Sequence, residues 1–299
     1  MVSGLHVPWA VGGPRINAAG KLEDFPGEWP TVPVHALRLW DTRTAWLHLQ
    51  PTPDQWTFAH LDDHLAKAAA NGVVDITLVL WGTPRWAASG ESPQDAPWLG
   101  PGSAWPPSDL ADWDAYVSTV VDRYAGRIGA YEIGNEPNLR AFWQGTPTAL
   151  AEMTARAARI IRARDPKARI LAPAVSLADS RGLTSASRFW RALAKAGADL
   201  DVATFHWYPR VADPKQIAPL SRAVREGMIR AGMPRLPMWV TEAGFRRAGA
   251  TRISTLIPRT LTAAQGTGVR RMYWYAWTDL PLGPLLPLHT GTRLAMGLT

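Results

Sequence analysis

The amino-acid sequence predicts an α/β protein of the (β/α)8 TIM-barrel class, and three observations lead to this prediction. Eight short apolar segments of β type recur along the chain. Most of the intervals between them carry the apolar spacing of amphipathic helices. The chain has 299 residues, of which 46% are hydrophobic, so it can bury one large core. We therefore expect strands and helices to alternate around one closed barrel, in a single domain over residues 1–299.

The expected strands are short runs bounded by turn-forming residues. In chain order they occupy residues 4–10, 34–40, 73–81, 128–134, 168–175, 200–207, 236–243 and 270–277. No stretch of the sequence approaches eighteen uninterrupted apolar residues, so the sequence contains no candidate membrane span.

The expected helices lie between these strands. They occupy residues 57–72, 108–126, 148–165, 185–198, 219–233 and 252–266. Pro258 falls inside the last of them and should kink or divide it, because proline has no backbone N–H to donate. Three prolines follow the eighth strand and argue against a full eighth helix, at positions 281, 284 and 287. We expect either an atypical barrel closure or a fragment.

An open doubly wound sheet is the competing arrangement. Such a sheet usually carries a glycine-rich phosphate loop after its first strand. The VGGP segment at residues 11–14 lacks the GxGxxG spacing, which favours the barrel.

The composition narrows the range of functions that the protein can have. The net charge is +7, but no run of four basic residues occurs and no nucleic-acid-binding module is recognisable, so we expect the arginines to lie on solvated helix faces. The absence of cysteine excludes disulfides and thiolate metal sites. Strand-like sequence begins almost at Met1, so we expect that any leader has been removed, and we favour a secreted or cell-envelope protein.

Sixteen tryptophans are far more than is usual, and several lie near the ends of predicted strands. Flat indole rings are good platforms for sugar rings. Trp81, Trp86 and Trp143 are therefore candidates for stacking on sugars at flanking subsites, with core packing as the alternative for each.

Two glutamates end predicted strands, Glu136 in IGNEPN and Glu242 in WVTEAGF. In a barrel the carboxyl ends of the strands converge on one rim, where catalytic residues lie. Two carboxylates roughly 5–5.5 Å apart there would suit cleavage of a glycosidic bond with retention of configuration. One would attack the sugar carbon and the other would protonate the leaving oxygen.

The residues around these glutamates extend the candidate site. Asn135 can donate to a sugar hydroxyl beside the reacting carbon. In FHWYP (205–209), His206 and Tyr208 lie on one face of the strand end, where the tyrosine can orient Glu242. We expect Arg38, at the end of the second strand, to pair with Glu242 and keep its pKa low.

Trp277, which ends the eighth strand in YAW, should form the floor of the sugar site. His60 and His64 lie on one helical face at the spacing of metal ligands. Their helix should lie outside the barrel, however, so we expect a solvated face, no metal and no cofactor.

This set of motifs resembles the clan A glycoside hydrolases, retaining enzymes built on (β/α)8 barrels. IGNEPN and WVTEAGF are similar to the clan's acid/base and nucleophile motifs, FHWYP to its strand-6 histidine and tyrosine, and YAW to its strand-8 tryptophan. The resemblance covers residues 4 to 280. Within the clan, LVLWGTPRWAAS (78–89) is similar to family 39, which includes bacterial exopolysaccharide endo-glycosidases, and family 5 is the other close relative.

The resemblance implies that Glu136 is the acid/base, Glu242 the nucleophile and Asn135 the contact of the sugar 2-hydroxyl. It predicts a glycosidase that acts on a polysaccharide or oligosaccharide by double displacement, from one catalytic domain. The alternatives are an inactive carbohydrate-binding barrel and a transglycosylase that uses the same residues. Pyranoside or furanoside substrates, and endo- or exo-action, remain open at this point.

Overall fold

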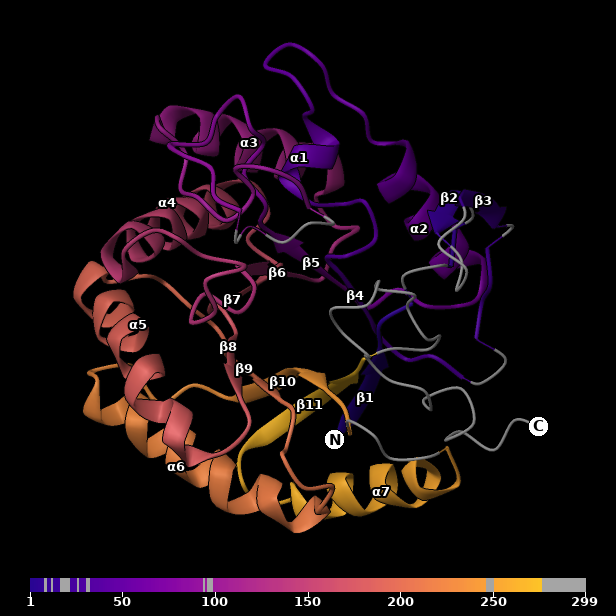
Figure 1. Cartoon of the computed structure of the whole chain (residues 1–299), viewed down its shortest axis with the longest axis vertical. Helices are drawn as coiled ribbons and strands as arrows, with labels where there is room; N and C mark the ends of the chain where they lie inside the picture. The colour runs from indigo at the N-terminus through magenta and orange to yellow at the C-terminus, as the bar shows by residue number, and fades with distance from the viewer. Residues whose placement is uncertain are drawn as a thin grey trace.

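The computed structural model describes residues 1–7, 10–11, 13–16, 22–25, 27–30, 33–93, 95, 99–245 and 250–275. Within them, one nine-stranded parallel sheet curls around a central axis and helices surround it (Figure 1). The strands are β1 (Val2–Leu5), β4 (Leu37–Leu39), β5 (Ile76–Leu80), β6 (Ala130–Ile133), β7 (Arg169–Leu171), β8 (Val175–Leu177), β9 (Ala203–Trp207), β10 (Met238–Ala243) and β11 (Val269–Trp274).

The two edges of this sheet meet. Its strand order is β7-β6-β5-β4-β1-β11-β10-β9-β8, and β7 and β8 are separated in the chain only by residues 172–174. A bridge joins Leu171 to Val202, just before β9, and a second bridge joins Asn135, after β6, to Ala174. β7 and β8 thus share one position between β6 and β9. The predicted (β/α)8 barrel class is confirmed, with its fifth strand in two parts.

The outer layer consists of α1 (Trp46–Leu49), α2 (Ala59–Ala70), α3 (Leu110–Tyr124), α4 (Pro147–Arg164), α5 (Leu183–Ala196), α6 (Ile217–Arg230) and α7 (Ala250–Ala263). The six predicted helices all form. α7 continues through Pro258 as one helix, so of the two expected outcomes, a kink or a division, the division is wrong. The predicted atypical eighth helix lies outside the described residues.

Three short elements between β1 and α2 were not predicted from the sequence. α1 is a single turn in the connection between β4 and α2. The strands β2 (Gly13–Ile16) and β3 (Leu22–Phe25) form a separate antiparallel pair in the connection between β1 and β4.

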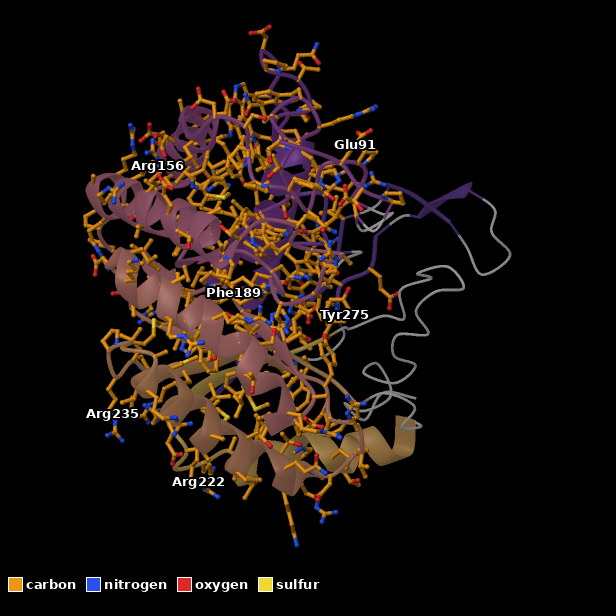
Figure 2. The ribbon with its side chains drawn as sticks, turned by 60° about the vertical axis from the view of Figure 1, so that its left-hand side comes forward. Glu91, Arg156, Phe189, Arg222, Arg235 and Tyr275 are labelled. Atoms are coloured by element: carbon orange, nitrogen blue, oxygen red, sulfur yellow. The ribbon has the colours of Figure 1, made fainter. Side chains whose placement is uncertain are left out.

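The outer helical layer carries much of the positive charge. Arg156 lies at the periphery with Arg222 and Arg235 (Figure 2), and it forms an ion pair with Asp114. On α2, His60 is partly exposed but His64 is only 2% exposed, so the expected solvated face is wrong for His64. None of the helices in the described part of the chain is both long and apolar enough to cross a lipid bilayer.

Candidate active site

The end of β6 breaks the alternation of a strand, and this brings two neighbouring polar side chains to the barrel mouth. Gly134 has φ +103°, and a Cβ on it would lie 2.8 Å from the ring of Trp81. Glu136 has φ +43°, one of two positive φ values at non-glycine residues in the described ranges. Such backbone strain is held in place by its surroundings and is common at functional sites.

A bulge at the end of β10 has a comparable effect. The register between β9 and β10 shifts between Val240 and Glu242. Thr241 and Glu242 are neighbours in the sequence, yet both reach polar partners inside the barrel: Thr241 donates to Glu132 at 2.8 Å, and Glu242 accepts from Arg38 at 2.7 Å. A β-bulge can re-aim a side chain in this way.

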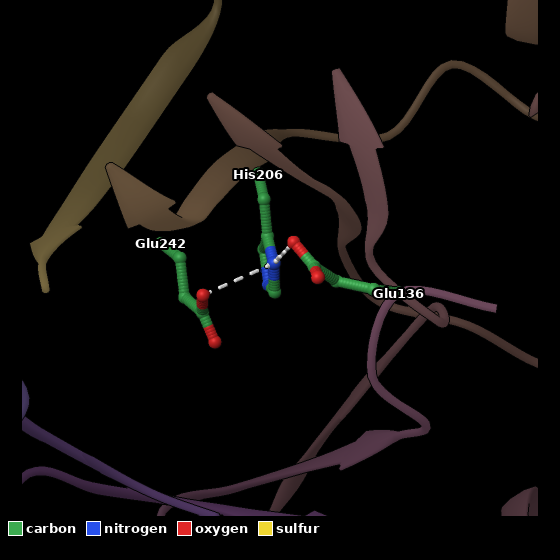
Figure 3. Close-up of side chains that lie close together, drawn as sticks. All are labelled: Glu136, His206 and Glu242. Carbon is green, nitrogen blue, oxygen red and sulfur yellow. Dashed lines mark hydrogen bonds and ion pairs between the residues drawn. The ribbon is translucent and has the colours of Figure 1, made fainter. Parts of the chain in front are cut away.

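The two glutamates converge at the mouth. Oxygen atoms of Glu136 and Glu242 and a ring nitrogen of His206 lie within 4.8 Å of one another, and all three side chains are buried. Figure 3 shows His206 between the two carboxylates. Its Nδ1 lies 2.9 Å from Glu136 Oε1 and 3.4 Å from Glu242 Oε2. The neighbouring Tyr208 donates to Glu242 Oε2 at 2.7 Å.

Arg38, which is fully buried, connects the residues of the site. Its Nη1 donates to Glu242 Oε1 at 2.7 Å, and its Nη2 donates to Asn135 Oδ1 at 2.9 Å. Its Nε donates to Glu132 Oε2 at 2.5 Å. The predicted pairing of Arg38 with Glu242 is confirmed. Because a guanidinium is a rigid planar group, these three bonds also fix its partners relative to one another.

Glu132 is a component of the site that the sequence analysis missed. It lies on β6 with no exposed surface, and its two oxygens accept from Arg38 and Thr241. The available signal was an acidic residue in the middle of an otherwise apolar strand, because buried charges are retained only when they are paired.

The electrostatics correct one expectation. Burial raises the pKa of Glu242, and this effect outweighs the opposing effects of His206 and Arg38. The prediction that Arg38 keeps this pKa low is therefore wrong for the net value, although Arg38 acts in the predicted direction. The negative charge of Glu136 contributes to the raised pKa.

Burial also determines the protonation of the other two groups. It lowers the pKa of His206 to about 4, so the ring is neutral at physiological pH, and Nδ1–H donates to Glu136. It raises the pKa of Tyr208 well above its usual value, so this hydroxyl stays protonated and donates to Glu242. The site therefore provides neutral donors to two carboxylates.

Two polar atoms at the site have no hydrogen-bond partner among the described residues. They are Asn135 Nδ2 and His206 Nε2. Since Arg38 occupies Asn135 Oδ1, the amide must present its N–H groups elsewhere. Buried polar groups are rarely left unpaired, so these two atoms indicate where a polar ligand would bind.

The tryptophan candidates differ in their surroundings. Trp81 and Trp143 are 3% and 5% exposed and contact each other with ring centroids 5.3 Å apart. Trp86 is partly exposed, and its Nε1 donates to the carbonyl of Gln50 at 3.1 Å. The burial of Trp81 and Trp143 leaves little ring surface for a sugar. Trp277 lies outside the described residues.

Carboxylates and a histidine can also bind a divalent cation. Here the oxygens of Glu242 and the Nδ1 atom of His206 already have hydrogen-bond partners within the protein. The same three side chains therefore form a hydrogen-bonded network without an ion.

Comparison with known proteins assigns the chain to a family. Residues 104–280, more than half of the chain, match the glycosyl hydrolase catalytic core family. The chain belongs to this family. Both Glu136 and Glu242 lie inside the matched region. A comparison with curated protein sequences gives no match.

Solved glycosidase structures share the fold of this family member. The β-xylosidase of Caulobacter crescentus CB15 is 22% identical, with a TM-score of 0.64 over 83% of this chain and 54% of that one. A glucosidase from Croceicoccus marinus is 18% identical, with a TM-score of 0.63 over 81% and 53%. A family 10 xylanase from Thermobacillus composti is 17% identical, with a TM-score of 0.57 over 85% and 81%. The chain spans about half the length of the first two proteins.

Proposed function

We propose that this protein is a retaining glycosidase of clan A type that cleaves a polysaccharide or oligosaccharide by double displacement. The observation that carries this proposal is the short separation of its two carboxylates: one oxygen of Glu136 and one oxygen of Glu242 lie within 4.8 Å of each other. Retaining enzymes hold their carboxyl groups about 5–5.5 Å apart, whereas inverting enzymes need about 6.5–9.5 Å to admit a water molecule.

In the first step Glu242 attacks the anomeric carbon and forms a glycosyl ester, while Glu136 gives its proton to the departing oxygen. Arg38 and Tyr208 each hold one oxygen of Glu242, which orients the carboxylate for attack. The negative charge of ionised Glu242 disfavours a second charge at Glu136 and keeps the acid protonated.

In the second step the ionised Glu136 removes a proton from water, which attacks the anomeric carbon and releases Glu242. Once Glu242 is esterified it no longer carries a negative charge that opposes the ionisation of Glu136, so one group serves as acid and then as base. The N–H of His206 stabilises Glu136 while it is charged. In this proposal Asn135 Nδ2 donates to the sugar 2-hydroxyl; its lack of a partner within the described residues supports this role.

The proposal is tested with activated aryl pyranosides and furanosides, by following the first product with proton NMR. We expect hydrolysis of at least one of them with retained anomeric configuration. An initially inverted product would contradict double displacement. Glu136→Ala should spare the first step for substrates with good leaving groups and slow the second, so that glycosyl-enzyme accumulates.

The same substrates separate the proposal from its alternatives. An inactive carbohydrate-binding barrel would bind glycans without releasing the aryl group. A transglycosylase would release it but transfer the sugar to an added alcohol or saccharide in preference to water.

A further inference from the structure

A second pair of polar side chains meets at the mouth, on the side opposite to Glu136. Asp41 follows β4, and Tyr275 follows β11. The hydroxyl of Tyr275 donates to Asp41 Oδ2 at 2.6 Å. Because the sheet order here is β4-β1-β11, this bond passes over the end of β1, where His6 lies. The rings of His6 and Tyr275 contact edge to face at 4.9 Å.

This pair is joined directly to the strand end that carries Glu242. The backbone N–H of Tyr275 donates to the carbonyl of Ala243 at 3.0 Å. Nε2–H of His6 donates to the carbonyl of Thr241 at 3.0 Å. The two bonds fix Tyr275 and His6 to the residues on either side of Glu242. Asp41, Tyr275 and His6 therefore form one wall of the mouth, attached beside Glu242.

The wall has more hydrogen-bond acceptors than donors. Oδ1 of Asp41 is shielded from solvent and has no partner in the described part of the chain. Nδ1 of His6 is equally buried and unpaired, and it is an acceptor because Nε2 carries the proton. Asp41 forms no ion pair among the described residues, and burial raises its pKa to about 6. Two buried acceptors without donors in the described part of the chain can accept hydrogen bonds from a ligand that brings its own O–H groups.

A sugar hydroxyl supplies such donors. In a retaining enzyme the leaving group lies against the acid, and the sugar that is transferred lies over the nucleophile. The wall of Asp41 and Tyr275 is attached beside Glu242, whereas Glu136 comes from β6, on the other side of the mouth. The wall thus lies beside the transferred sugar rather than the leaving group.

We propose that Asp41 determines the specificity for the transferred sugar: its carboxylate, held by Tyr275, accepts hydrogen bonds from hydroxyl groups of that sugar. This inference rests on the proposed glycosidase function. Free hydroxyls are required, and a uronic acid is disfavoured because its carboxylate would be repelled by Asp41. The substrate class is therefore a glycan whose transferred unit is neutral and unsubstituted at these hydroxyls.

The test uses the activated aryl glycoside that the wild-type protein hydrolyses fastest, together with its monodeoxy analogues and the corresponding uronide. The variants are Asp41→Asn, Asp41→Ala and Tyr275→Phe. Asp54→Asn is the matched control, since Asp54 is exposed.

We expect Asp41→Asn and Asp41→Ala to lower kcat/KM on the parent glycoside at least 100-fold, because a site built to bind a hydroxyl penalises its loss strongly. On one deoxy analogue, the wild type should already be slow and the same variants should change kcat/KM less than fivefold. Tyr275→Phe should raise KM more than it lowers kcat. Asp54→Asn should match the wild type on every substrate. The wild type should prefer the neutral glycoside to the uronide, and Asp41→Asn should narrow that preference.

Two results overturn the inference while leaving the glycosidase proposal intact. One is an equal loss of kcat/KM by the Asp41 variants on the parent and on every deoxy analogue. This result would mean that Asp41 binds only water or only stabilises the local fold. The other is faster hydrolysis of the uronide by the wild type. If the wild type hydrolyses no glycoside at all, the proposed function fails and this inference fails with it.

Discussion

Two buried arginines stand at opposite ends of the barrel, and they differ in how fully their surroundings are paired. At the amino ends of the strands, Arg271 makes bonds of 2.7 and 2.6 Å to the two oxygens of Asp75. It also donates to the hydroxyl of Tyr273 at 2.8 Å and lies over the ring of Trp239 at 4.0 Å. None of these side chains keeps a buried polar atom without a partner within the described residues.

At the carboxyl ends, Arg38 is bonded just as fully, but the groups around it are not. Unpaired buried atoms occur here on Asp41, Asn135 and His206. A buried polar atom that stays unpaired costs about 1–3 kcal/mol, and a polar ligand at the mouth would remove this cost. The contrast indicates that the Arg271 network closes the barrel, while the Arg38 network is prepared for a polar ligand.

The largest expected effect comes from replacing a carboxylate by an amide at the Arg38 end. We expect Glu242→Gln to lower kcat by about 10⁴-fold or more, because it removes the proposed nucleophile. Thermal unfolding should show equal or higher stability, since Arg38 keeps Glu132 as a partner and one buried negative charge is gone. A variant that retains full activity would contradict the contrast between the two ends.

A second prediction concerns pH. Arg38 opposes the effect of burial on Glu242, so Arg38→Met should raise the pKa of Glu242 further. As the proposed nucleophile, Glu242 must be ionised, so we expect activity to be lost as pH falls through this pKa. The acid limb of kcat/KM should move upward by about one pH unit or more, with a lower maximum rate. Arg271→Met is the matched control and should leave the limb where it is in the wild type.

The same amide substitution at the other end should affect stability alone. Asp75→Asn leaves the Arg271 guanidinium without its charged partner. The side chain of Asp75 is 34% exposed, so we expect a loss of about 1–3 kcal/mol in the free energy of unfolding rather than the full effect of a buried pair. Denaturant unfolding measures this loss. A kcat that also falls more than threefold for the folded enzyme would mean that the two networks are coupled.

The smallest effect involves His64 on α2, which belongs to neither network. Burial lowers its pKa from 6.5 to about 4. As pH falls from 6.5 to 4, the unfolded chain takes up a proton that the folded chain refuses, so stability decreases over this window. His64→Gln should make the decrease in melting temperature between these two pH values smaller by a few degrees. An unchanged slope would show that His64 is not held neutral.

The sequence predicted most of the fold because each strand and helix is a local pattern. The division of the fifth strand into β7 and β8 and the continuity of α7 through Pro258 depend on neighbouring elements, which local patterns do not report. His64 was misjudged for the same reason, since one helical face can lie against a loop as well as against solvent.

For the site, strand-end motifs predicted the convergence of Glu136 and Glu242, the Arg38 contact and the Tyr208 contact. Glu132 and Asp41 were missed, because the sequence does not show whether an acidic residue in a strand or loop belongs to the site until its hydrogen-bond partners are known. The pKa of Glu242 was misjudged, since charge pairs can be guessed from sequence but the extent of burial cannot.

The proposed mechanism requires Glu242 to form a covalent bond to the sugar. This bond can be trapped by treating the protein with a 2-deoxy-2-fluoro aryl glycoside carrying an activated leaving group, followed by proteolysis and mass spectrometry of the labelled peptide. We expect one sugar per molecule, attached to Glu242, and no label in Glu242→Gln. A label on Glu136, Glu132 or Asp41 in place of Glu242 would show that Glu242 is not the nucleophile.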